Sequence, residues 1–335
     1  MSPKQKALLV GIRYANLSPR WTLESTYTDV HHLREFLIST LKFRREDIVE
    51  MTDDLPHDDD RYPNHANLLK QLQALAKDAD PGDHLVFHFS GHGSQKPDQN
   101  KDESDGQDET IWPADVEIKD DAHDDADNVI LDDTIKAELV DKLPDEAHLV
   151  IILDCCHSGT GADLKYTYTD HVEIEPGRHE PVDQTAQEPP KKLAMPGLTG
   201  DKAASAAPPT MKSPGVGAVV VSWAACQDPR FTISFSNSGG CFVKAFIDAF
   251  HEHKDATHQE LLQRIKVKMA SAAEGHFEEN RHRMTDADWE QLQGWWKTAR
   301  TEPVLGVLHD YRKVLDTPVA QTFGGHQRHH LWPFW

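Results

Sequence analysis

The strongest constraint on the fold of this chain is a series of short, continuously apolar runs, each followed by polar residues. These runs have the length of strands and no polar face, and they lie at residues 6–14, 84–90, 148–154 and 216–226. Segments with apolar residues at helical spacing lie between or beside them, at residues 27–41, 64–79 and 131–143. Apolar strands that alternate with helices are typical of parallel sheets. The sequence therefore predicts an α/β fold with a mostly parallel central sheet and helices on both faces.

Composition divides the 335 residues into three parts. Residues 1–168 form a larger part, which includes an acidic segment at 98–133. Residues 169–215 are rich in Pro, Ala, Gly and charge and show no periodicity, which predicts a flexible connector. Order is expected to return in a smaller part and tail, residues 216–335, whose strands join the same sheet.

Charge and cysteine usage limit the classes of partner and compartment. The net charge of −21 would repel nucleic acids and anionic membranes, whereas it would attract a basic substrate. No apolar stretch reaches the ~18–20 residues that span a bilayer. Four cysteines, two of them adjacent, favour a reducing intracellular compartment. We expect a cytoplasmic protein, with the nucleus as a second location.

Two of the apolar runs end in residues that carry chemistry. His92 lies between two glycines just after the run at 84–90, and Cys156 lies just after the run at 148–154. The carboxyl ends of parallel strands meet at one edge of a sheet, so we expect these side chains to lie close together. A cysteine beside a histidine forms a thiolate nucleophile, and the imidazole can protonate the leaving amine. The backbone N–H groups of Gly93 and Cys156 are candidate oxyanion donors.

Simpler interpretations of these residues also exist. A histidine after a strand is usually a turn residue, and a buried cysteine is usually a small apolar side chain. Metal binding by Cys155, Cys156 and His157 is disfavoured, because adjacent residues at a strand end point to opposite sides. A redox pair is disfavoured too, because adjacent cysteines lack the usual two-residue spacer. The two strand-end motifs together favour catalysis over each alternative.

The stretches "HFSGHGSQ" and "LDCCHSGTGADLKYTY" strongly resemble the metacaspases, cysteine peptidases of the caspase-like clan. The resemblance covers residues 6–168 and, more weakly, 216–250. It implies a caspase-like fold and cleavage of peptide bonds after Arg or Lys. His92 falls at the catalytic histidine of the family and Cys156 at the nucleophile, while Cys155 is expected to face the core or the side of the site. The order of the motifs and the short connector resemble type I members.

The resemblance also implies an acidic specificity pocket formed by Asp29, Ser90 and Asp154. Two carboxylates and a hydroxyl suit a guanidinium group, which they can bind bidentately, and they would exclude an acidic side chain. The alternative for Asp29 is a purely local role in the first turn of a helix. The chain departs from the family here, because the stretch "TLESTYTDV" lacks the Gly-Cys pair that often precedes the aspartate.

Calcium is the cofactor that the resemblance implies, held by Asp108, Asp132, Asp133 and Asp163. Calcium takes six to eight oxygen ligands, several of them carboxylates. The alternative is that the acidic segment is a solvated, partly disordered loop. Binding is expected to order this segment and complete the site, as in other order–disorder switches.

We thus predict a calcium-dependent, monomeric cysteine endopeptidase that acts on proteins or peptides with Arg or Lys at the cleaved position. Autoprocessing is expected in the connector, at one of the candidate residues Lys191, Lys192, Lys202 and Lys212. The alternatives are a catalytically silent calcium-binding scaffold on the same fold, and a caspase that cleaves after Asp. The two acidic pocket residues disfavour the second.

Overall fold

A computed structural model gives the fold of the chain. It describes residues 3–98, 106–119, 126–155, 164, 166–169, 172–174, 217–225, 234–235, 239–283, 285–287, 289–290, 303–308 and 317–324. Within these ranges, no helix combines the length and the apolar character needed to cross a membrane.

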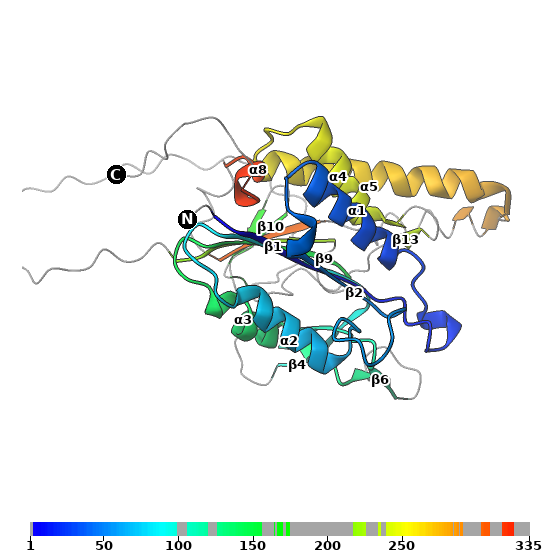
Figure 1. The fold of residues 1–335 in the computed structure, drawn as a ribbon. Helices are drawn as coiled ribbons and strands as arrows, with labels where there is room; N and C mark the ends of the chain where they lie inside the picture. The colour runs from blue at the N-terminus through cyan, green and yellow to red at the C-terminus, as the bar shows by residue number, and fades with distance from the viewer. Residues whose placement is uncertain are drawn as a thin grey trace, which may run out of the picture.

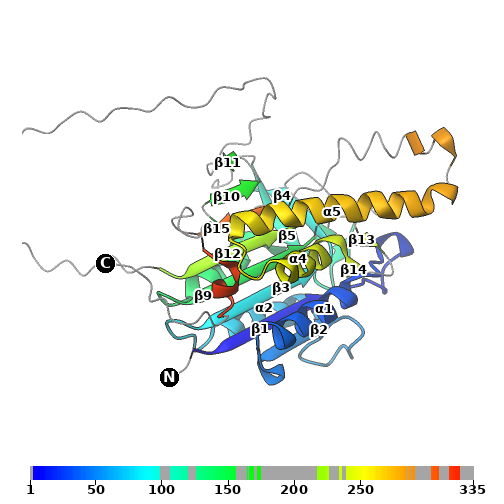
Figure 2. The same cartoon turned by 90° about the horizontal axis from the view of Figure 1, so that it is seen from above.

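An eight-stranded sheet forms the centre of the molecule (Figure 2). Its strands in spatial order are β11 (Val172–Ile174), β10 (Tyr166–Thr169), β15 (Val304–Val307), β12 (Val219–Ala224), β9 (His148–Asp154), β3 (His84–Ser90), β1 (Gln5–Gly11) and β2 (Ile48–Thr52). Neighbouring strands from β2 to β12 are parallel, and the pairs beyond β12 are antiparallel. The predicted α/β fold with a mostly parallel sheet is confirmed.

Helices cover both faces of this sheet (Figure 1). One face carries α1 (Thr26–Ser39), α4 (Cys241–Glu252), α5 (His258–Asn280) and the short α8 (Val319–Thr322), and the other carries α2 (His65–Ala76) and α3 (Asp132–Glu138). Successive residues of a strand point to opposite faces. Leu9 of β1 therefore packs in the core with Leu33 of α1, and Leu8 packs in the opposite core with Leu72 of α2.

Local sequence accounts for where several elements begin and end. The Asn64 side chain accepts the Asn67 N–H at the start of α2, and Thr257 and Glu260 form a capping box at the start of α5. β1 ends at Gly11, earlier than the predicted residue 14, because the backbone then turns and Tyr14 adopts a φ of 57°.

The helix predicted over residues 131–143 is shorter in the structure. α3 ends at Glu138, and a 3-10 turn follows at Val140–Lys142. Leu143 is extended, with ψ 139°, because Pro144 after it disfavours helical backbone. Further 3-10 turns in the described part of the chain lie at Pro19–Trp21, Arg45–Asp47 and Arg281–Arg283.

The described residues of the acidic segment form short paired strands. For these residues, the alternative of a solvated, partly disordered loop is therefore wrong. β4 (Gly93–Pro97), β5 (Gln107–Ile111) and β8 (Ile130–Leu131) form an antiparallel sheet, and β6 (Glu117–Ile118) pairs with β7 (Ala126–Asp127). Burial of the apolar side chains between the acidic residues stabilises this arrangement of strands. Ile111 and Trp112, for example, lie in the core beside α2. The Trp112 indole N–H also donates to Ser94 Oγ at 2.9 Å.

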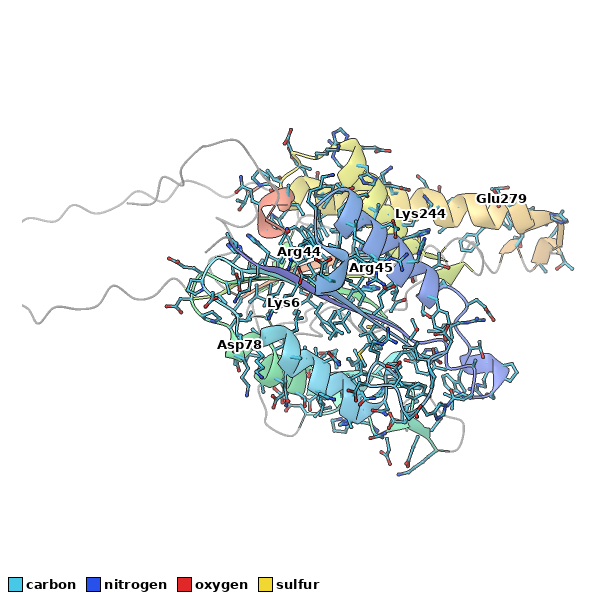
Figure 3. All side chains as sticks on the ribbon, viewed as in Figure 1. Lys6, Arg44, Arg45, Asp78, Lys244 and Glu279 are labelled. Carbon is cyan, nitrogen blue, oxygen red and sulfur yellow. The ribbon has the colours of Figure 1, made fainter. Side chains whose placement is uncertain are left out.

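The residues after the connector complete the central sheet. β12 pairs in parallel with β9, with Val219 opposite His148. A further two-stranded ribbon, β13 (Ser234–Phe235) and β14 (Gly239–Gly240), leads into α4. Lys244 on α4 and Glu279 on α5 are exposed on the outer side of their helices (Figure 3). The division into a larger part, a connector and a smaller part stays a prediction, and residues 175–216 lie outside the described ranges.

Candidate active site

Strand register brings the predicted site residues to one edge of the sheet. Ser90 ends β3 and pairs with Asp154, which ends β9, while Gly11 at the end of β1 pairs with Ser90. His92 follows Ser90 by two residues, and Gly91 between them donates its N–H to the Asp154 carbonyl at 3.3 Å. The carboxyl ends of these parallel strands therefore carry the described residues of the candidate site.

The His92 ring is oriented by backbone and aromatic contacts. Its Nε2 lies 2.8 Å from the carbonyl oxygen of Trp21. A carbonyl only accepts hydrogen bonds, so Nε2 carries the proton of the neutral ring and Nδ1 is the basic nitrogen. The ring centroid lies 4.8 Å from that of Tyr14, 5.6 Å from Trp21 and 5.2 Å from Trp112. The imidazole is thus held in one tautomer and one orientation, as a general base requires.

The three predicted pocket residues come together in the structure. The Ser90 hydroxyl donates to Asp29 Oδ2 at 2.8 Å. Asp29 lies in the first turn of α1, and all three residues are at most 5% exposed. A purely local helix-start role for Asp29 is wrong, since its other oxygen accepts the Gly240 N–H at 2.5 Å. Asp154 Oδ2 in turn accepts the N–H of Val243, in the first turn of α4, at 3.4 Å.

Burial and like charge set the electrostatics of this pair. The pKa of Asp29 is raised well above its usual value, first by burial and second by the charge of Asp154. The hydrogen bonds from Ser90 and Gly240 oppose this rise. The neighbouring thiol of Cys241 has a pKa raised to about 12, by burial and then by Asp154. The site therefore favours a proton or a cation between the two carboxylates.

Gly240 is a site residue that sequence reasoning missed. A Cβ atom built on it would lie 2.2 Å from Asp154 Oδ2 and 2.8 Å from Asp29 Oδ2. Its missing side chain therefore lets the start of α4 approach both carboxylates. The available signal was the Gly-Gly pair directly before an amphipathic helix, which also fits an ordinary helix start. Only the contacts across the sheet edge distinguish the two.

We expect Gly240→Ala to destabilise the protein by about 1–3 kcal/mol, because the added methyl group must displace a buried carboxylate. Gly275→Ala is the matched control: this glycine lies inside α5 with no atom within 4 Å of an added Cβ. It should stabilise the protein by about 0.5–1 kcal/mol. Urea unfolding of both variants measures the difference, and equal effects would contradict the close approach at Gly240.

Three of the four predicted calcium ligands are among the described residues, on the small sheet and at the start of α3. Asp108 is on β5, and Asp132 and Asp133 begin α3. The pairing of Thr110 with Leu131 brings the start of α3 against β5. Asp108 and Asp132 are each 2% exposed, and the Asp133 N–H donates to Asp132 Oδ1 at 2.9 Å. Carboxylate oxygens are the ligands that a hard cation such as calcium takes. Within the described ranges, however, no group of three or more His, Cys, Asp or Glu forms a complete metal site.

Comparisons with known proteins identify the family of this chain. The profile of a family described as "Metacaspase, peptidase C14 domain" matches residues 5–165. Metacaspase-1 of Cryptococcus neoformans is 34% identical over 290 residues, which are 79% of this chain and 60% of that protein. Metacaspase-1A of Aspergillus terreus is 32% identical over 291 residues, 80% of this chain and 68% of that protein. This chain belongs to the metacaspase family.

The chain matches only part of the length of some relatives, and its sequence identity to the solved structure is low. The chain spans about 60% of the length of the Cryptococcus neoformans and Coccidioides immitis metacaspases. The crystal structure of a Geobacter sulfurreducens protein shares the fold, with a TM-score of 0.52 and 16% identity, covering 94% of this chain and 98% of that one. The predicted membership of the family and the predicted caspase-like fold are both confirmed.

Several predicted residues of this metacaspase lie outside the described ranges. They are Cys156, Asp163, Lys191, Lys192, Lys202 and Lys212. Cys155 lies within the described ranges. Its side chain is 1% exposed and packs in the core beside α2, which is one of the two positions predicted for it. Gly93 begins β4 next to His92, whose carbonyl accepts the Trp112 N–H. Gly93 is therefore at a non-hydrogen-bonded position of the ladder, so its N–H points away from β5.

Proposed function

We propose that this metacaspase is a cysteine endopeptidase that cleaves peptide bonds after Arg or Lys with Cys156 and His92. The observation that carries the proposal is the buried cluster of Asp29, Ser90 and Asp154 at the same sheet edge as the oriented His92 imidazole. Cys156 follows Asp154 by two residues in the chain. From this place in the sequence we expect the nucleophile to lie near both the base and the pocket.

The reaction follows from the roles of these groups. His92 Nδ1 takes the proton of the Cys156 thiol, and the thiolate attacks the carbonyl carbon of the substrate. The Gly93 N–H is a donor for the oxyanion that forms. Collapse of this intermediate breaks the C–N bond, and the imidazolium gives its proton to the leaving amine. Water, deprotonated by His92, then hydrolyses the thioester and releases the thiolate. The Trp21 carbonyl stabilises the imidazolium and keeps Nδ1 aimed in one direction.

Electrostatics supports specificity for a cation at the cleaved position. Two facing carboxylates, with the pKa of Asp29 raised, would gain most from a guanidinium or ammonium group, which favours the charged form of Asp29. An acidic side chain would add a third like charge. Because the pocket oxygens are buried against the start of α4, a substrate side chain reaches them only if the segment around Gly240 moves.

Calcium belongs to the same proposal, with Asp108, Asp132, Asp133 and Asp163 as its ligands. When bound, it supplies positive charge that compensates the carboxylates of β5 and α3. We also propose autoprocessing in the connector at Lys191, Lys192, Lys202 or Lys212, since each supplies a cationic side chain for the acidic pocket. We also propose that the protein is a monomer in the reducing cytoplasm, where its thiols stay free.

Paired fluorogenic peptides that differ only in Arg, Lys or Asp at the cleaved position test the function. They should be assayed with millimolar calcium and with a chelator. Calcium-dependent cleavage after Arg and Lys supports the proposal. Cleavage after Asp would overturn the acidic pocket. Absence of cleavage under every condition, with intact calcium binding, would favour the silent scaffold.

We expect Asp132→Asn to weaken calcium binding on the order of tenfold or more, because a buried carboxylate ligand loses its charge. The matched control is Asp141→Asn, which removes the same charge from an exposed position just after α3. Calorimetric titration with calcium gives the affinity, independently of activity. Equal affinities for the two variants would remove Asp132 from the ligand set.

A further inference from the structure

We propose that Tyr14 and Asp53 are positioning residues for His92, and that together they set the orientation of the catalytic imidazole. This inference rests on the proposed function for its catalytic consequence, whereas its structural content can be measured directly. The three residues follow three neighbouring strands: Asp53 follows β2, Tyr14 follows β1 and His92 follows β3. Hydrogen bonds connect them in that order along the carboxyl edge of the sheet.

Tyr14 makes the contact with His92. Its hydroxyl oxygen accepts the backbone N–H of His92 at 3.0 Å and donates to the Trp112 carbonyl at 2.7 Å. Burial raises the pKa of the Tyr14 phenol well above its usual value, so the hydroxyl keeps its proton and both bonds persist at neutral pH. The phenol ring also packs against the imidazole, with centroids 4.8 Å apart. Tyr14 therefore holds both the backbone and the ring of His92.

Asp53 holds Tyr14 in an unusual backbone conformation. Tyr14 has a φ of 57°, which is costly for a residue with a large side chain. Asp53 compensates, because its carboxylate accepts the N–H of Arg13 at 2.8 Å and that of Tyr14 at 2.9 Å. It also accepts the hydroxyl of Tyr27 at 2.7 Å. Three donors converge on one side chain, and only a carboxylate offers acceptors on both of its oxygens.

Asp53 also holds the loop that contains the second contact of His92, the Trp21 carbonyl. The loop after β1 is closed on itself, since the Leu17 N–H donates to the Tyr14 carbonyl and the Leu23 N–H donates to the Arg13 carbonyl, both at 2.9 Å. Trp21, whose carbonyl accepts the His92 Nε2 proton, lies within this loop. Asp53 therefore positions both groups that orient His92, the Tyr14 hydroxyl and the Trp21 carbonyl. Loss of the Tyr14 hydroxyl removes only the first of these two contacts.

This difference predicts a graded outcome in two variants. Tyr14→Phe keeps the ring and removes only the hydroxyl, so we expect kcat for an Arg peptide to fall roughly tenfold with KM nearly unchanged. Asp53→Asn places an amide N–H₂ against a backbone N–H and releases the loop. We expect it to lower kcat by about 10–100-fold and also to change the ratio of the two His92 tautomers.

The control is Tyr62→Phe. Tyr62 is a tyrosine buried in the same core cluster, and its ring stacks on His57. This variant should leave kcat and the His92 tautomer as in the wild type. A merely structural role of Tyr14 or Asp53 would lower the unfolding temperature without changing the His92 signals, so all variants are compared at temperatures where each is folded.

Nitrogen NMR of ¹⁵N-histidine-labelled full-length chain is the deciding measurement. The chain has 21 histidines, and the spectrum of His92→Gln identifies the signals of His92 by difference. Altered Nδ1 and Nε2 shifts in Tyr14→Phe and Asp53→Asn, with Tyr62→Phe unchanged, support the proposal. Unaltered His92 signals in both variants overturn it. This readout needs no turnover, so a chain without peptidase activity would refute the proposed function and still leave the positioning test decisive.

Discussion

Cys156→Ala is expected to lower kcat for an Arg peptide on the order of 10⁴–10⁶-fold, to the level that binding alone sustains. The reason is that, in the proposed mechanism, the Cys156 sulfur forms the covalent bond with the substrate, and an alanine side chain cannot do so. Hydrolysis of a fluorogenic Arg peptide measures the loss. Folding should be unaffected, because alanine removes one atom beyond Cβ, and calorimetric unfolding checks this.

Cys155→Ala is the matched control, because it removes the same thiol one residue earlier. The Cys155 side chain is buried in the core beside α2, so its loss should cost about 1 kcal/mol of stability and leave kcat within a few-fold. The assignment of the nucleophile would be refuted if Cys155→Ala lost activity and Cys156→Ala kept it.

Asp29→Asn should lower kcat/KM for an Arg peptide on the order of 100-fold while it stabilises the protein at neutral pH. Activity should fall because, in the proposed pocket, a guanidinium would lose one of its two carboxylate partners. Stability rises because the change removes a buried charge that faces Asp154. The amide can still accept the Gly240 N–H and can donate to the Ser90 hydroxyl, so both hydrogen bonds survive.

The effect of the Asp29 carboxyl on the free energy of unfolding depends on pH, and the raised pKa gives its sign. The pKa of Asp29 is higher in the folded protein than in the unfolded chain, so the folded state binds more protons above about pH 4. The free energy of unfolding of the wild type should therefore decrease as pH rises from about 4 through the folded pKa of Asp29. Asp29→Asn should lack this decrease, which unfolding in urea at several pH values would show.

Asp83→Asn provides the comparison for a buried aspartate outside the pocket. Asp83 precedes β3 at the opposite end from His92, and its carboxylate accepts the Lys4 N–H at 2.7 Å and the Asp80 N–H at 2.9 Å. Its replacement should lower stability and leave kcat/KM unchanged. A destabilised Asp29→Asn with full activity would refute both the electrostatic account and the pocket.

Local patterns predicted the parts of this protein that depend on residues close together in the chain. The runs 84–90 and 148–154 became β3 and β9 with the predicted bounds, because a continuous apolar run of that length has few alternatives to a buried strand. Helix α3 was predicted less well, since the shift from an α-helix to a 3-10 turn before Pro144 leaves the apolar spacing unchanged.

By itself, the sequence determined the strand–helix alternation, the strand-end positions of His92 and Asp154, and the resemblance to metacaspases. Each follows from side-chain periodicity or from a contiguous motif. Only the tertiary structure decided that Gly240 approaches Asp29 and that the Trp21 carbonyl binds the His92 imidazole. These contacts join segments tens to hundreds of residues apart, often through backbone atoms. Every residue except proline carries the same backbone groups, so no side-chain pattern could have revealed which of them meet.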